Sequence, residues 1–274
     1  MNRKNHWQYE SMSWLEIRDV VERKLQPVVA IPFGTVEDHG PHLPLSTDNN
    51  ILMAILNEVA MRSEGDLLVT PLIPFGLDEH HMDFPGTISI EMETCLAYVS
   101  QVANSIARHG FTHILIVNGH GSNQPVADLA ARKCVLSTGI ICASTTFNAA
   151  VDPVLIRDVV EEQRKGGPGS IAHAGEYETS MMLHIAPELV QMEKASRDIG
   201  QLKLKYFNWD YPEPSAYSWQ DYWSRFTREG ICGDPTVASG ESGNIIFQAT
   251  VTRFLELVRE FQTIPIRDRV DHHK

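Results

Sequence analysis

The residues most able to do chemistry lie in one short segment, GTVEDHGPHLPLSTD, which ends at Asp48. It holds Glu37, His39, His42 and Asp48, and its glycines and prolines exclude a helix before Asp48. In an extended chain Glu37 and His39 point to the same side, as metal ligands must, and Asp38 faces away. Asp48 falls at the start of a predicted helix, where a carboxylate is held rigidly and could bridge two ions.

Three further segments carry histidine and carboxylate side chains. His120 lies between glycines in VNGHGSN, where the lack of side chains lets a ligand approach the backbone. The motif HAGEYETS adds one histidine and two carboxylates, which are His173, Glu176 and Glu178. One carboxylate, Glu176, is expected to have a structural role. The segment EHHMDFPGT adds His80 and His81, and we expect one of them to line a pocket.

Histidine and carboxylate ligands without cysteine suit Zn, Mn or Fe(II), and hydrolysis is the natural use of such a centre. The sequence contains no HExxH motif, no GxSxG motif and no Walker A loop, so other hydrolase and nucleotide-binding signatures are absent. Taken singly, each residue also fits a structural role, such as a helix cap for Asp48 or a packed histidine. Because these histidines and carboxylates are grouped in short segments, a role as metal ligands is favoured.

The elements that must position these residues alternate between strands and helices. Apolar or β-branched runs predict strands over residues 27–31, 67–73, 114–117 and 140–145. Helices are predicted over residues 48–61, 91–108 and 123–136. This alternation predicts a single α/β domain with a mostly parallel sheet flanked by helices. Ligands bind such sheets beyond the carboxyl ends of the strands, and three of the predicted strand exits carry the histidines and carboxylates.

The second half of the chain has a weaker pattern. It predicts helices over residues 154–163, 177–185 and 243–261, and no domain boundary is evident, so residues 1–274 are expected to form one domain. Residues 200–232 form an aromatic-rich insertion, a lid or an oligomer contact. Its aromatic stretch, residues 206–223, contains Tyr206, Trp209, Tyr211, Tyr217, Trp219, Tyr222 and Trp223.

Composition limits the partners. The 274 residues include 23 Lys and Arg against 35 Asp and Glu, a net charge of −12, which argues against nucleic acid or an anionic membrane. No apolar run approaches the ~18 residues of a membrane helix, and the N-terminal segment has no apolar signal-peptide stretch. We therefore expect a cytoplasmic protein. The four cysteines show no CxxC spacing and are expected to be reduced and packed.

The motifs PFGTVEDHGPHLPLSTD, FGLDEHHMDFPGT, VNGHGSN and HAGEYETSMMLHIAPELV follow the order and spacing of the creatininase (creatinine amidohydrolase) family. The chain resembles that family over about residues 28–192 and, weakly, over 233–236. The resemblance implies one α/β domain, two divalent ions per chain, a small-molecule amide substrate and a homo-oligomer, with a hexamer favoured. The implied reaction is attack of a metal-bound hydroxide on a cyclic or linear non-peptide amide.

The resemblance also implies roles for individual residues. Glu37 and His120 match the ligands of one ion, His39 matches a ligand of the other, and Asp48 matches the carboxylate that bridges both. His173 matches the catalytic histidine, which would move a proton to the leaving nitrogen.

Several positions differ from creatininase. A tyrosine and a metal-binding glutamate follow the NGH histidine there, whereas Gly121 and Ser122 follow it here. The second ion has thus lost a ligand. Glu178, the conserved carboxylate of the HAG motif and an expected catalytic residue, is the candidate replacement, with weaker occupancy as the alternative. The stacking tryptophan before the HAG motif is replaced by Gly169, and a pocket serine by Asp78.

Because of these differences, we do not expect creatinine to be the substrate. The predicted substrate pocket contains Asp78, His81, Gly121 and Ser122. The same metal site could instead serve a deformylase or a lactonase, because the same nucleophile attacks formamides and esters. A protein that binds a small molecule or one structural ion without catalysis is the remaining alternative.

Overall fold

Four parallel strands form one sheet at the centre of the molecule: β1 (Val28–Phe33), β2 (Leu67–Val69), β3 (His113–Asn118) and β4 (Ile141–Thr146), in the order β2-β1-β3-β4. The structure is a computed structural model that describes residues 7–146, 155–199, 204–208, 210 and 215–273. Every residue of β1 and β3 is buried, as expected for parallel strands that are covered on both faces. The parallel α/β sheet that the sequence predicts is confirmed.

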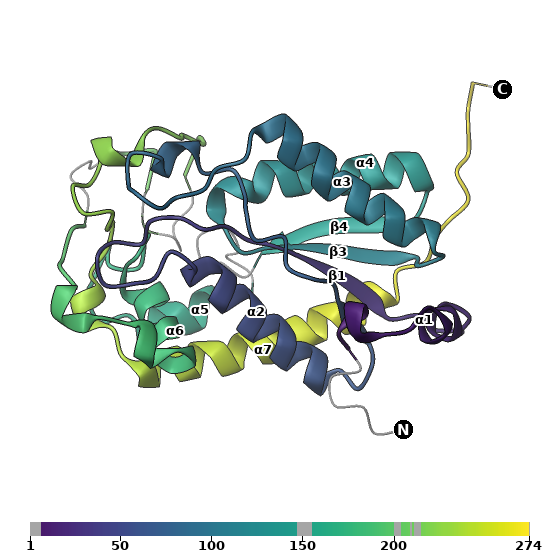
Figure 1. The fold of residues 1–274 in the computed structure, drawn as a ribbon, viewed down its shortest axis with the longest axis horizontal. Helices are drawn as coiled ribbons and strands as arrows, with labels where there is room; N and C mark the ends of the chain where they lie inside the picture. Colours follow the sequence, from purple (N-terminus) through teal and green to yellow (C-terminus); the bar gives the residue numbers. More distant parts are fainter. Residues whose placement is uncertain (1–6, 147–154, 200–203, 209, 211–214, 274) are drawn as a thin grey trace.

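Helices cover both faces of the sheet (Figure 1). On one face lie α3 (Met92–Arg108) and α4 (Gln124–Thr138), and on the other lie α2 (Thr47–Arg62), α5 (Arg157–Gln163), α6 (Glu176–Ile185) and α7 (Gly240–Gln262). Alternate residues of β1 serve the two layers, because Val28 and Ala30 join one apolar cluster and Val29 and Ile31 the other. Short 3-10 helices span Tyr9–Ser11, Glu79–His81, Gly121–Asn123, Pro187–Leu189, Met192–Lys194, Trp223–Arg225 and Pro235–Val237.

Two strand boundaries differ from the predicted ones by two residues or more. Strand β2 ends at Val69 instead of residue 73, because Pro71 has no N–H to donate, and pairing resumes only at an isolated bridge between Ile73 and Phe33. Strand β1 continues two residues past the predicted end at residue 31. Its Pro32 still accepts a hydrogen bond at its carbonyl from the Ile73 N–H, at 2.9 Å.

Three helices show the largest differences from the prediction. Helix α1 (Trp14–Val21) was not predicted, although Ser13 and Glu16 form a capping box that marks its start. Helix α7 begins three residues early, at Gly240, because the Ser239 side chain accepts from the Ser242 N–H. The predicted start of a helix at residue 154 lies outside the described residues, and α5 begins at Arg157.

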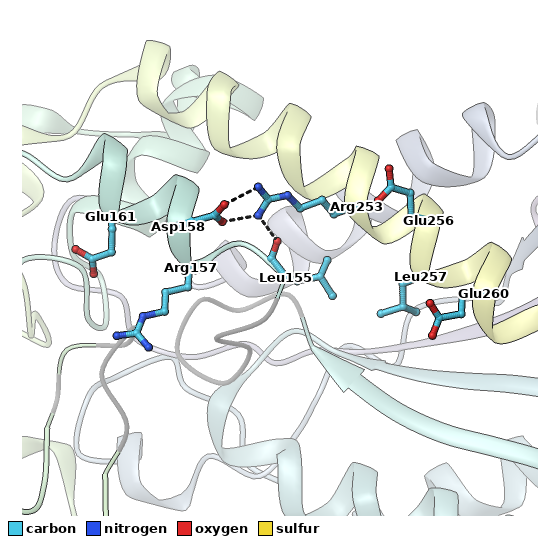
Figure 2. A pocket seen from close by; sticks show the side chains of 8 residues that line it. All are labelled: Leu155, Arg157, Asp158, Glu161, Arg253, Glu256, Leu257 and Glu260. Carbon is cyan, nitrogen blue, oxygen red and sulfur yellow. Dashed lines mark hydrogen bonds and ion pairs between the residues drawn. The ribbon is translucent and has the colours of Figure 1, made fainter.

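Arg253 joins α7 to α5 beside a cavity of about 780 Å³ (Figure 2). Its guanidinium donates to both carboxylate oxygens of Asp158 and to the carbonyl of Leu155, so the cavity is walled by charged side chains. None of the candidate ligands lines it. In the part of the chain that the structure describes, no helix is both long enough and apolar enough to span a membrane.

The described part of residues 200–232 has few regular elements. Aromatic rings pack against one another there, with Phe207 against Tyr217 and Trp219 against Phe226. The 3-10 helix Trp223–Arg225 brings the buried Trp223 to the histidines at the carboxyl end of the sheet. Trp209 and Tyr211, also part of the predicted aromatic stretch, lie outside the described residues.

Candidate metal centre

The segments that leave β1 and β3 meet at the carboxyl end of the sheet. After β1, the Glu37 N–H donates to the carbonyl of Leu45 at 3.0 Å, which folds the glycine- and proline-rich segment back on itself. After β3, the Asn118 side chain holds both backbone polar groups of His120, accepting from its N–H at 2.9 Å and donating to its carbonyl at 2.6 Å. These bonds fix where the Glu37 and His120 side chains can reach.

A tight turn and a helix start bring in the second motif. Ala174 has a φ of 52°, in the left-handed region, and its N–H donates to Glu178 Oε2 at 2.6 Å. Glu178 lies in the first turn of α6, and Asp48 lies in the first turn of α2. Both carboxylates therefore sit at helix N-termini, where negative charge is stabilised.

One group of ligand atoms forms around His120. Its Nδ1 lies 3.1 Å from Glu37 Oε1 and 3.1 Å from Asp48 Oδ2. Ligands that each lie about 2.0–2.2 Å from a zinc ion are separated by roughly 3–3.5 Å. All three side chains are buried, so the group is a candidate set of ligands for a cation.

A second group forms around His39. Its Nε2 lies 3.3 Å from Asp48 Oδ1 and 3.7 Å from Glu178 Oε2, and the His39, Asp48 and Glu178 atoms form a compact ligand set. The His39 Nδ1 lies 3.3 Å from the Glu37 carbonyl, which as an acceptor places the ring proton on Nδ1. The opposite nitrogen, Nε2, is buried and makes no hydrogen bond with the described residues, as suits a ligand lone pair. Asp48 thus presents a different oxygen to each histidine.

The pKa values of the side chains in this cluster are shifted far from their ordinary values. Burial raises the pKa of Glu37 well above its usual range, although His120 opposes the shift, and burial raises the pKa of Glu178 to about 7 against the opposing effect of His39. Burial disfavours a charged His39, but Asp48 and Glu178 outweigh it and raise the pKa of this imidazole to about 10. Buried carboxylates that draw positive charge in this way form a donor set that fits a divalent cation.

Asp78 lies behind His120. Its Oδ1 is 2.8 Å from His120 Nε2, and its other carboxylate oxygen accepts a bond from Thr35 Oγ1. Asp78 is fully buried. The sequence predicted this residue in the substrate pocket, whereas the structure places its carboxylate against a candidate ligand.

His173 borders the cluster. Its Nε2 lies 2.8 Å from the Asp38 carbonyl, which therefore accepts the ring proton, and its Nδ1 lies 3.8 Å from Glu37 Oε1. The ring of His173 is 4.4 Å from the ring of His39, between centroids. Burial and the nearby His39 lower the pKa of His173 well below its usual range, so the imidazole is neutral with a free lone pair on Nδ1.

The remaining residues that the sequence predicts in the substrate pocket are His81, Gly121 and Ser122. His81 Nε2 is 3.5 Å from Glu37 Oε2. Ser122 Oγ is 2.9 Å from His80 Nε2, and a Cβ at Gly121 would meet no atom of the described residues within 4 Å, so that position borders open space.

Two side chains that the sequence grouped with the ligands have other roles. His42 Nε2 lies 2.9 Å from Thr179 Oγ1 and joins neither ligand group. Glu176 accepts from the N–H groups of Lys165 and Gly166, so it anchors a loop, in agreement with the structural role expected for it. Asp38 does not turn away from the site as predicted, because it is buried and lies within 4.8 Å of the rings of His81 and His173.

Sequence reasoning also missed an aromatic wall. Trp223 stacks on His81, with ring centroids 5.0 Å apart and planes at 27°, and meets His173 edge-on at 5.1 Å. The family's tryptophan position, Gly169, cannot carry a side chain here, because its φ is +87° and a Cβ would collide with Ile199. The aromatic enrichment of residues 206–223 was the available signal, but it did not indicate which ring reaches the histidines.

Known proteins share this architecture. The family model described as creatinine amidohydrolase (Creatininase) matches residues 10–258. A mycofactocin precursor peptide peptidase of Mycobacterium ulcerans is 32% identical over 232 residues, which cover 82% of each chain. The creatinine amidohydrolase of Pseudomonas putida is 27% identical over 250 residues, covering 85% of this chain and 89% of that one.

Solved structures agree with these relatives. A structure described as "Creatininase Mn" is 25% identical and superposes with a TM-score of 0.74, covering 94% of this chain and 99% of that chain. The family match covers the two strand exits, the HAG turn and most of α7. The chain belongs to the creatininase family of metal-dependent amidohydrolases.

Proposed function

We propose that the protein hydrolyses the C–N bond of an amide other than creatinine, using two divalent ions held by two groups of side chains that share Asp48. Glu37, Asp48 and His120 would hold one ion, and His39, Asp48 and Glu178 the other. The observation that carries the proposal is the orientation of Asp48, whose Oδ2 faces His120 at 3.1 Å and whose Oδ1 faces His39 at 3.3 Å. A carboxylate needs this orientation to bridge two ions.

Ions in these positions supply the charge that activates water and polarises an amide carbonyl. Glu178 fills the place left open by Ser122, because its Oε2 already lies 3.7 Å from His39 Nε2. The absence of cysteine from both groups favours Zn, Mn or Fe over softer metals.

His173 is the proposed proton carrier. Its Nε2 is held by the Asp38 carbonyl, which leaves Nδ1 directed at the cluster beside Glu37. A neutral, buried imidazole accepts a proton from attacking water at Nδ1 and returns it to the leaving nitrogen. We also propose that Glu178 contributes to catalysis by holding the second ion beside His39, since its Oε2 lies 3.7 Å from His39 Nε2.

The side chains around the ligand groups differ from those expected of a site for creatinine. Gly169 cannot provide a stacking ring, and Trp223 approaches from a different segment of the chain. We propose a non-peptide amide as substrate. A peptide amide is the second candidate, because the relative at 32% identity is named a peptide peptidase.

Assembly and location follow the family likeness and the composition. We propose a homo-oligomer, with a hexamer favoured, and a cytoplasmic location; light scattering of the purified protein tests the assembly. Residues 200–232 are proposed to form a wall or lid of the site, which the contact of Trp223 with His173 supports.

The deciding experiment is elemental analysis of protein purified without chelator, before and after addition of Mn, Zn or Fe. Two ions per chain support the proposal, and one ion supports a mononuclear enzyme. No ion, even after addition, contradicts the metal centre and favours a binding protein. Asp48→Ala should empty both groups, whereas the matched control Asp19→Ala, on the exposed face of α1, should keep both ions.

Activity is then measured on amides, formamides, lactones and short peptides. Cleavage of amides supports the proposed reaction. Preferential cleavage of formamides or lactones would replace it with the deformylase or lactonase alternative.

A further inference from the structure

An apolar cavity of about 420 Å³ opens beside the candidate metal centre. It lies between the first turns of α3 and α4 and the segment around Tyr222. The apolar side chains that line it include Leu77, Met92, Leu96, Val126 and Leu129. Its volume falls in the range of about 300–1,000 Å³ that is typical of small-molecule sites.

Two polar residues connect this cavity to the ligand groups. His80 and Ser122 both line it, and His80 Nε2 lies 2.9 Å from Ser122 Oγ. On its other side, His80 forms a close set with Glu37 and His120, whose ligand atoms lie within 4.8 Å of one another. His80 and Ser122 thus stand between the cavity and the ligand groups, and a molecule whose amide reaches these ligands would pass them to enter the cavity.

The open position at Gly121 widens this connection. A Cβ at Gly121 would meet no atom of the described residues within 4 Å, and Gly121 lies between His120 and Ser122 in the chain. Because glycine has no side chain, the space beside residue 121 is left for a group of the substrate.

The charge of the lining indicates what fits. None of the described residues that line the cavity is a lysine or an arginine, whereas Glu79 and Asp221 do line it. The Asp221 carboxylate is already paired with the Arg225 guanidinium, at 2.7 Å. A phosphate or carboxylate would therefore find no unpaired cationic side chain among the described lining residues, whereas an apolar group would cover the half-exposed Met92 and Leu129.

We propose that this cavity is the subsite for an uncharged apolar substituent, aromatic or branched aliphatic, carried by the amide substrate. The inference rests on the proposed function, since it assumes that the amide reacts at the two ligand groups. It narrows the substrate class to amides with an apolar arm and disfavours phosphorylated and carboxylated ones.

Binding of ketones tests the subsite without any hydrolysis. The probes are butan-2-one, 4-phenylbutan-2-one and 4-oxopentanoate, which share a methyl ketone and have no C–N bond to break. Calorimetry on the protein as purified should show that 4-phenylbutan-2-one binds at least about tenfold more tightly than butan-2-one. The anionic 4-oxopentanoate should bind no better than butan-2-one.

Two variants locate the binding. Leu129→Lys places a cation in the cavity at a half-exposed position of α4, and should reverse the preference between the phenyl and carboxylate probes. Leu96→Trp fills the cavity and should remove the phenyl preference. The matched control is Leu136→Lys, the same substitution on the same helix at a 79% exposed position away from the cavity, which should bind like the unchanged protein.

A phenyl preference that is absent, or that survives both cavity variants, overturns the proposal. So does a change in oligomeric mass in Leu129→Lys with an unchanged preference, because this face would then be a contact between copies of the chain. The two proposals fail separately. Selectivity among the ketones without cleavage of any amide contradicts the proposed function but supports the subsite. Cleavage of amides without selectivity among the ketones supports the proposed function but contradicts the subsite.

Discussion

The two ring nitrogens of His120 face different carboxylates. Nδ1 lies 3.1 Å from Asp48 Oδ2, and Nε2 lies 2.8 Å from Asp78 Oδ1. A histidine that binds a metal through one nitrogen is commonly oriented by a carboxylate on the other, which fixes the tautomer and strengthens the ligand. We therefore propose that Asp78 orients His120 and so affects the binding of the proposed ion.

Replacement of Asp78 by Asn should weaken metal binding by about 10- to 100-fold, the usual effect of removing such a partner. Competition with a metal-binding dye measures the affinity, and circular dichroism checks that the fold is kept. The control is Asp83→Asn, an exposed carboxylate in the same segment. Unchanged metal affinity in Asp78→Asn would show that the carboxylate does not orient His120.

The two glutamates of the HAG motif should separate metal binding from stability. Glu178→Gln removes a proposed ligand of the second ion, so we expect one ion per chain in place of two, with the group around His120 still filled. Glu176→Gln replaces one of the two oxygens that accept from the Lys165 and Gly166 N–H groups by an NH2 donor, so it should lower the free energy of unfolding by about 1–3 kcal/mol and keep both ions. Elemental analysis and urea denaturation of both variants measure the difference. Two ions in Glu178→Gln would contradict the ligand assignment.

The α/β class and the strand exits were predictable because each depends on local pattern. The buried runs of β1 and β3 are continuous and β-branched, and the residues after them are unmistakably polar. Boundaries were less accurate where a proline intervened. Pro71 ended β2 early, and Pro32 did not end β1, because the outcome depends on which backbone groups the neighbouring strand uses.

The partners of the site residues could not be read from the sequence. Asp78 was assigned to a pocket because of its position in a motif, but only the packed structure shows its carboxylate behind His120. Trp223 lies far along the chain from His81 and His173, in a segment without a periodic pattern. Such contacts depend on how distant segments fold together.

Acid should destabilise the protein through His42. Burial lowers the pKa of this imidazole to about 4, from an unfolded value near 6.5. Between these values the unfolded chain binds the proton and the folded chain does not, so stability is fully present above about pH 6.5 and is lost as the pH falls towards 4. The loss from this group amounts to at most about 3 kcal/mol.

The measurement is urea denaturation of the unchanged protein and of His42→Gln between pH 7 and 4, with chelator present so that metal release does not contribute. The variant lacks the titrating group, so its free energy of unfolding should fall less on acidification. Parallel curves for the two proteins would show that His42 titrates alike in the folded and unfolded states.

Trp223 should limit the positions that the His173 ring can adopt. The indole meets the His173 ring edge-on at 5.1 Å and stacks on His81 at 5.0 Å, so it limits the movement of both imidazoles. Small misplacement of a catalytic group can reduce the rate by about 100-fold, and we expect a loss of this order in kcat for Trp223→Leu on an amide that the protein cleaves, with both ions retained. Trp219→Leu is the matched control, because Trp219 packs on Phe207 and Phe226 in the same segment. Equal losses in the two variants would indicate a general effect on residues 200–232, whereas a loss confined to Trp223→Leu assigns the effect to the ring that contacts His173.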